Sequence, residues 1–166
     1  MKNRKLFSLL MAIIVICCFA FFALGSGEST ETDQGSGKAE SVSEDSNLGD
    51  YKVVIDSCRL AKDYEGEDIV IVKYLFTNNA EKATSFMVAF DENVYQDGIG
   101  LNETFVVDDS ANYSADNQTK EIKKGATLDV EVAYDLNDLT TDIEVEVQEL
   151  FSLDDSVVKK TFSIAE

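Results

Sequence analysis

Between Tyr51 and Ile164 the chain is a series of short segments rich in β-branched and aromatic residues, with turn-forming residues between them. In residues 69–76, the sequence Ile-Val-Ile-Val-Lys-Tyr-Leu-Phe has the composition of a buried strand. In residues 127–136, apolar side chains alternate with Asp and Glu, which is the period of a strand with one face in a core. No part of this region has a helical period. The region therefore predicts an all-β domain.

An immunoglobulin-like antiparallel β-sandwich of seven to eight strands is the fold that this pattern favours, because two sheets can then bury their apolar faces against each other. A small barrel is the alternative. The predicted strands are Tyr51–Leu60, Asp68–Asn78, Thr84–Phe90, Val94–Leu101, Thr127–Leu136, Ile143–Val147 and Val157–Ile164, with marginal pieces at Phe105–Val107 and Thr119–Ile122. The positions expected to be most buried are Val70, Val72, Tyr74, Phe76, Leu128, Val130, Val132 and Ile143.

The first 25 residues have the pattern of an export segment. Met1 to Lys5 is a short basic head, and Leu6 to Leu24 is a run of 19 residues without a charge. As a helix this run would be about 28 Å long, close to the thickness of a bilayer's hydrocarbon core. It is therefore either a long signal peptide cleaved after Gly25 or a retained anchor, and its length favours the anchor. In both cases the rest of the chain is extracytoplasmic, at the cell surface or secreted.

The three cysteines argue against a lipid anchor and against a disulfide. A lipidated cysteine follows a small residue at the end of the apolar run, whereas Ile16 precedes Cys17, and six apolar residues follow Cys18. Cys58 is the only cysteine of the exported part, so no disulfide can form within it. We predict that Cys58 is a small buried residue in a strand, and a reactive thiol is the alternative.

Residues 26–48 are rich in Ser, Gly, Glu and Asp, with Val42 as the only large aliphatic residue before Leu48. Such a segment buries too little apolar surface to offset the entropy that ordering it would cost. We therefore predict a flexible linker here, followed by a single domain at residues 49–166. A mature N-terminal tail left by cleavage is equally compatible with this composition.

Charge and composition exclude several functional classes. Residues 26–166 contain 11 basic and 32 acidic residues, a net charge of −21, which repels nucleic acid and anionic lipid headgroups. The chain has no His, the commonest general base and zinc ligand. We therefore expect no enzymatic activity, no cofactor and no metal site, and contact with the membrane only through Leu6 to Leu24.

The acidic residues are interpreted as solvated surface. A glycosidase pair needs one acid with a raised pKa in an apolar cleft, whereas doublets in loops of so acidic a chain are usually exposed. The same holds for outward strand positions such as Glu131 and Glu144, so stability should rise from pH 7 to about 5 as repulsion is neutralised. The doublets are Asp91-Glu92, Asp108-Asp109 and Asp154-Asp155. Asp108-x-Ser110-x-Asn112 has the spacing of a calcium loop, but Tyr113 stands where that loop requires glycine.

Gln96, Asp97 and Gly98 are the tentative partner-contact residues. An Asp-Gly pair inside a strand pattern indicates a special backbone conformation, either a bulge or a turn that fixes strand register. A contact with a ligand or partner is the alternative. Asn78 and Asn79 are interpreted similarly, as turn residues that tolerate a left-handed backbone.

Two segments carry a resemblance to a known family. These are Tyr-Leu-Phe-Thr-Asn-Asn at residues 74–79 and Tyr-Gln-Asp-Gly-Ile-Gly-Leu at residues 95–101, with further matching segments at residues 51–55, 62–66, 121–125 and 133–136. The chain resembles an uncharacterised family of exported Gram-positive proteins with an immunoglobulin-like domain, often lipoproteins. The resemblance spans about Gly49 to Ile164 and implies a sandwich and export, but no activity and no site residues.

Taken together, the sequence predicts an exported module that binds an unidentified protein or glycan at the cell surface. A passive structural module of the envelope is the alternative, and an exported enzyme is the third hypothesis.

Overall fold

The computed structural model describes residues 39–42, 46–105 and 107–165 of the 166-residue chain. The predicted export segment at residues 1–25, with Cys17 and Cys18, lies outside these described residues. Within them, no helix is both long enough and apolar enough to cross a membrane.

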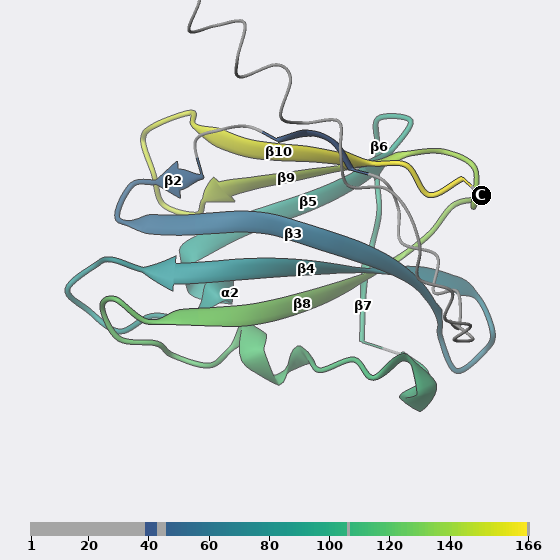
Figure 1. Ribbon diagram of the computed structural model, residues 1–166, viewed down its shortest axis with the longest axis horizontal. Helices are drawn as coiled ribbons and strands as arrows, with labels where there is room; N and C mark the ends of the chain where they lie inside the picture. The colour runs from purple at the N-terminus through teal and green to yellow at the C-terminus, as the bar shows by residue number, and fades with distance from the viewer. Residues whose placement is uncertain (1–38, 43–45, 106, 166) are drawn as a thin grey trace, which may run out of the picture. The chain divides into compact units, whose positions relative to one another are not determined.

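The strands of the described part form two five-stranded antiparallel sheets (Figure 1). Sheet A has the order β2-β3-β4-β8-β7, and sheet B has the order β1-β10-β9-β5-β6. The predicted sandwich is thereby confirmed, since a barrel would need one closed sheet. The strands are β1 (Ala39–Val42), β2 (Asn47–Leu48), β3 (Tyr51–Lys62), β4 (Asp68–Asn78), β5 (Phe90–Gln96), β6 (Ile99–Gly100), β7 (Glu103–Thr104), β8 (Thr127–Asp135), β9 (Ile143–Glu149) and β10 (Val157–Phe162).

The main core lies between the two sheets and contains the residues that the alternation predicts. Phe76 and Tyr74 of β4 are fully buried, and their rings contact that of Phe86 with centroids 6.1 and 5.1 Å apart. Of the predicted core positions, Leu128 is only partly buried, and the others are fully buried: Val70, Val72, Tyr74, Phe76, Val130, Val132 and Ile143. Cys58 is also buried, which raises the pKa of its thiol to about 11 and confirms the structural interpretation of this residue.

The prediction of a strand at Thr84–Phe90 is wrong. Residues Phe86–Ala89 form one helical turn, α2, in which the amides of Val88 and Ala89 both donate to the carbonyl of Ser85. Phe86 and Ala89 are its buried residues, and a spacing of three places them on one side of a helical turn. The core contact of Phe86 therefore comes from a helix, and β5 begins only at Phe90.

The prediction of a single strand at Val94–Leu101 is also wrong. Asp97 and Gly98 have positive φ values of 50° and 72°, and they join β5 to β6 as a two-residue hairpin turn. Such a turn requires a left-handed backbone at both central residues, which an Asp-Gly pair adopts readily.

The predicted linker, residues 26–48, contains two strands. Strand β1 pairs with β10, with Ala39 opposite Phe162, and β2 pairs with the start of β3. Leu48 is buried in the main core. The linker prediction is therefore too long at its C-terminal end, because edge strands pair through backbone groups and tolerate the polar side chains of this segment.

A second, smaller apolar cluster lies on the outer face of sheet A. Its buried members are Ile69, Ile71, Val107 and Ala133. The marginal strand predicted at Phe105–Val107 is reduced to an isolated bridge between Asp63 and Val107, and the one at Thr119–Ile122 to a bridge between Thr84 and Ile122. Between Val107 and Thr119 the chain forms two 3₁₀ turns, η1 (Asp109–Ala111) and η2 (Ala115–Gln118).

Candidate functional site

The proposed contact residues Gln96, Asp97 and Gly98 hold the fold together at one end of the sandwich. Gln96 is 2% exposed, and its amide nitrogen donates to the carbonyls of Asp138 and Thr141 at 3.0 and 2.9 Å. Its side-chain oxygen accepts from the amide of Asn137 at 2.8 Å. Gln96 therefore fixes the connection between β8 and β9 and is not available to a partner, while Asp97 and Gly98 remain exposed at the hairpin tip.

The two asparagines expected to tolerate left-handed backbone do not use it, because Asp97 and Asn112 are the positive-φ non-glycine residues of the described part. Asn78 is instead fully buried, and its amide nitrogen donates to the carbonyls of Lys82 and Ile122 at 2.9 and 2.8 Å. Asn78 thus ties two connections to the end of β4.

The acids of residues 108–112 are used in local hydrogen bonds. The carboxylate of Asp108 accepts from the amide of Ser110 at 2.8 Å, and hydrogen bonds from the hydroxyl and the amide of Ser110 lower the pKa of Asp108. Asp109 accepts from the hydroxyl of Tyr64 at 2.7 Å. Among the described residues no group of three or more His, Cys, Asp or Glu side chains is arranged to hold a metal ion.

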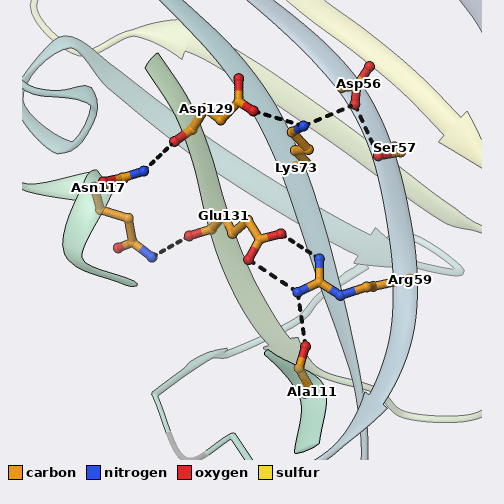
Figure 2. Close-up of polar contacts among 9 residues, drawn as sticks. Asp56, Ser57, Arg59, Lys73, Ala111, Asn117, Asp129 and Glu131 are labelled. Carbon is orange, nitrogen blue, oxygen red and sulfur yellow. Dashed lines mark hydrogen bonds and ion pairs between the residues drawn. The ribbon is translucent and has the colours of Figure 1, made fainter. Parts of the chain in front are cut away.

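The centre of the outer face of sheet A carries a network of opposite charges (Figure 2). Arg59 of β3 reaches across β4 and binds both carboxylate oxygens of Glu131 on β8, at 2.5 and 3.1 Å. The same guanidinium donates to the carbonyl of Ala111 at 3.3 Å. Lys73 of β4 lies between Asp129 at 2.9 Å and Asp56 at 4.0 Å. The prediction of a solvated Glu131 is therefore wrong, because a cross-strand partner holds it partly buried, whereas Glu144 is exposed as expected.

Two amides in η2 cover the free edge of β8. Asn117 donates to the carbonyl of Asp129 at 2.8 Å (Figure 2), and Gln118 donates to the carbonyl of Glu131 at 2.7 Å. These carbonyls are two residues apart, so the side chains occupy positions where a neighbouring strand would bind. This network stabilises the outer face of sheet A and closes its edge, and its groups are engaged with one another.

One acid lies between the sheets, contrary to the prediction that Asp91-Glu92 is a solvated doublet. Glu92 shares the inner face of β5 with the buried Phe90 and Val94, and it lies opposite Val147 of β9. Burial, together with repulsion from the nearby Glu103, raises the pKa of its carboxyl to about 8.

A second acid near Glu92 is shifted in the same direction. Burial raises the pKa of Glu103, so the environments of these two carboxyls do not push their pKa values apart, as those of an acid and base pair would. The hydroxyls of Tyr74 and Tyr134 lie 3.5 Å apart in the same region, and burial raises the pKa of each tyrosine, with a smaller contribution from the two glutamates.

Exposed apolar side chains gather at the opposite end of the sandwich from the hairpin of Asp97. They belong to α2 and to the connection between β9 and β10, where the amide of Leu150 donates to the carbonyl of Ala89 at 3.0 Å and holds the two segments together. Phe151 is 83% exposed. We call this group the apolar end; its residues are Met87, Val88, Leu150, Phe151 and Leu153.

Sequence reasoning missed the apolar end. Part of it could have been found from the sequence Leu-Phe-Ser-Leu at residues 150–153. Three large apolar residues within four positions of a surface connection indicate an interaction site. The other two residues, Met87 and Val88, could not be found from the sequence, because their exposure depends on α2 being a helical turn rather than a strand.

A sequence profile for a family described as a domain of unknown function (DUF5067) matches residues 26–149. The chain belongs to the DUF5067 family. The resemblance to an uncharacterised family is thereby confirmed. The matched range of this DUF5067 protein includes α2 and ends at residue 149, so three of the five residues of the apolar end lie beyond it.

The fold of the DUF5067 chain is similar to that of a solved structure described as "a putative lipoprotein from Staphylococcus aureus subsp. aureus NCTC 8325". The two are 19% identical and superpose with a TM-score of 0.54, over 76% of this chain and 94% of the staphylococcal one. At this identity the similarity establishes the fold. No curated protein sequence matches the chain.

Proposed function

We propose that this DUF5067 protein is an exported, non-catalytic binding module of the bacterial cell surface, and that it contacts its partner through the apolar end. The observation that carries the proposal is the gathering of exposed apolar side chains from two segments, with Phe151 83% exposed. Soluble domains rarely expose such a group without a use for it. Aliphatic side chains favour a protein partner over a glycan.

Export is supported by the N-terminal sequence, in which a basic head precedes 19 uncharged residues, and by the lipoprotein description of the staphylococcal neighbour. The position of the apolar end agrees with this. The chain enters β1 at Ala39, opposite Phe162 at the last position of β10, whereas the connection bearing Phe151 precedes Val157 at the first position (Figure 1). The apolar end therefore lies at the other end of β10 from Ala39, the first described residue of β1.

The experiment is cross-linking on living cells. A tagged full-length chain is produced in a Gram-positive bacterium, and external protease is added to wall-stripped cells, where we expect it to remove the domain. A bifunctional cross-linker on intact cells should then yield a discrete product with the wild type and with Phe105→Ser, a control that changes an exposed Phe outside the apolar end.

The double variant Phe151→Ser/Leu153→Ser should lose that product. Protection of the domain from protease would refute export. A pattern of products that is the same in all three proteins would instead favour the passive structural module.

A further inference from the structure

We propose that the partner of the apolar end is a cationic amphipathic peptide segment, one that presents an apolar face bordered by Lys and Arg. This inference rests on the proposed function, since it names the chemistry of the partner that the apolar end would bind. It is argued from the charges around the exposed apolar side chains.

The connection that carries Phe151 and Leu153 is acidic. Between Glu149 and Ser156 the chain has three acids and no base. Two of these acids, Asp154 and Asp155, directly follow Leu153. Both aspartates are exposed. An apolar surface bordered in this way is complementary to an apolar surface bordered by positive charge.

The neighbouring turn between β2 and β3 extends this acidic border. A side chain at Gly49 would meet the carboxylate of Glu149, so the turn and the end of β9 are adjacent. The next residue in the turn is the exposed Asp50. The border therefore contains acids from two separate segments.

Sheet A also carries exposed bases at this end, with Lys52 near the start of β3 and Lys82, Lys120, Lys123 and Lys124 in its connections. Two of these bases are engaged by other side chains. Lys124 is paired with Glu81, and Lys120 donates to the side-chain oxygen of Asn117 at 2.8 Å. Helix α2 carries no charge, so its exposed Met87 and Val88 add only apolar surface.

The charge of the whole exported part points in the same direction. Residues 26–166 carry a net charge of −21, which attracts cationic segments over long range and opposes a second copy of the same chain. The same charge opposes an anionic membrane surface, although Phe and Leu at the tip of a loop could otherwise enter a bilayer. A cationic segment with an apolar face satisfies both the local and the overall chemistry.

The test uses the full chain in nanodiscs of zwitterionic lipid, with empty nanodiscs as the blank. The probe is a fluorescently labelled helical peptide of Lys and Leu whose Leu residues form one face. Fluorescence anisotropy should show saturable binding that weakens as salt is raised. A scrambled peptide of the same composition and a polylysine of equal charge should both bind more weakly.

Three variants separate the contributions. Phe151→Ser/Leu153→Ser should weaken peptide binding by about tenfold to a hundredfold, the loss expected when a buried apolar side chain is removed from an interface. Asp154→Asn/Asp155→Asn should weaken it less and reduce its dependence on salt. Phe105→Ser should bind like the wild type, and thermal unfolding should show that all variants are folded.

Equal affinity of the wild type and Phe151→Ser/Leu153→Ser would overturn the proposal, because the peptide would then be held by net charge alone. Binding to lipid vesicles that depends on Phe151 and Leu153, without saturable peptide binding, would overturn it in favour of a membrane surface. If cross-linking on cells depends on the apolar end but the peptide does not bind, the proposed function stands and this partner assignment is wrong.

Discussion

Both faces of β4 contain buried residues, but a different part of the chain covers each face. On the inner face, Tyr74 and Phe76 pack against sheet B in the main core. On the outer face, Ile69 and Ile71 are also fully buried, but they are covered by the segment around Val107. Beyond that cover the outer face becomes polar, with Lys73 held between two aspartates.

The difference explains the composition of β4. A strand with one solvated face would alternate apolar and polar residues, whereas Ile-Val-Ile-Val at residues 69–72 is continuous because both faces are covered there. The alternation returns at Lys73, where the cover ends. The outer cluster has only four buried members, far fewer than the main core, so the inner face should contribute most of the stability.

The largest expected effect tests the inner face. Phe76→Ala should lower the free energy of unfolding by about 3–5 kcal/mol, because a fully buried ring leaves a cavity between the sheets. This is a large share of a domain stability of roughly 5–15 kcal/mol. Thr77→Ala, on the outer face of the same strand, is the control. A loss below about 1 kcal/mol in chemical denaturation of the Phe76 variant would contradict the inner-face packing.

A matched pair of substitutions tests the outer cover. Ile71→Ala should cost about 2–4 kcal/mol, since Ile71 is fully buried, whereas Leu75→Ala on the same face should cost about 1 kcal/mol or less. Leu75 lies beyond the cover and is partly exposed. Equal losses in urea denaturation would show that the segment around Val107 does not protect Ile71 in solution.

The smallest expected effect concerns the acid on the inner face. The pKa of Glu92 is raised to about 8, so its contribution to stability is complete below its ordinary value of about 4.5 and is lost as pH rises toward 8. Glu92→Gln should therefore stabilise the domain by about 1–3 kcal/mol at pH 8, where water reaching the side chain limits the gain. At pH 4 the variant should resemble the wild type, as measured by thermal unfolding across pH.

The charged groups near Glu92 also raise the pKa of its carboxyl. Glu103 and Asp91 repel its charge, and the tyrosines facing it, Tyr74 and Tyr134, supply no positive charge. Asp138 opposes the trend only at lower pH, because hydrogen bonds from Thr140 and Thr141 lower its pKa to about 2. If the stability of the Glu92→Gln variant fell as steeply between pH 5 and 8 as that of the wild type, the pH dependence would come from repulsion among surface acids and not from Glu92.

The sequence predicted the elements whose period is strict. Residues 127–136 alternate without interruption, and β8 covers Thr127–Asp135 as expected. It failed where a segment is too short to show a period. Residues 86–89 are one turn long, so their apolar character fits a strand and a helix equally well. At Asp97-Gly98 the turn was recognised as a special conformation, but its role as the end of a strand was decided by the pairing of β5 with β6.

The candidate site was less predictable for the same kind of reason. Exposure depends on which segments meet in space, and the hydrogen bond from Leu150 to Ala89 joins two residues that are 61 positions apart in the chain. For Gln96 the sequence left a structural role and a partner contact both open. Its side-chain amide is used by the β8–β9 connection, which only the tertiary structure shows.

The sequence by itself determined the all-β class, the inner core and the acidic character of the domain, because strand period and composition are local properties of the chain. Only the tertiary structure decided which polar groups are buried and which apolar groups are left exposed. Glu92 lies between sheets because the register of β5 places it opposite Val147. Phe151 is exposed because the connection from β9 to β10 leaves the sandwich after Glu149, where no second layer covers it. Whether a side chain is buried depends on which other segment packs against it, so burial is determined by the tertiary structure and not by the local sequence.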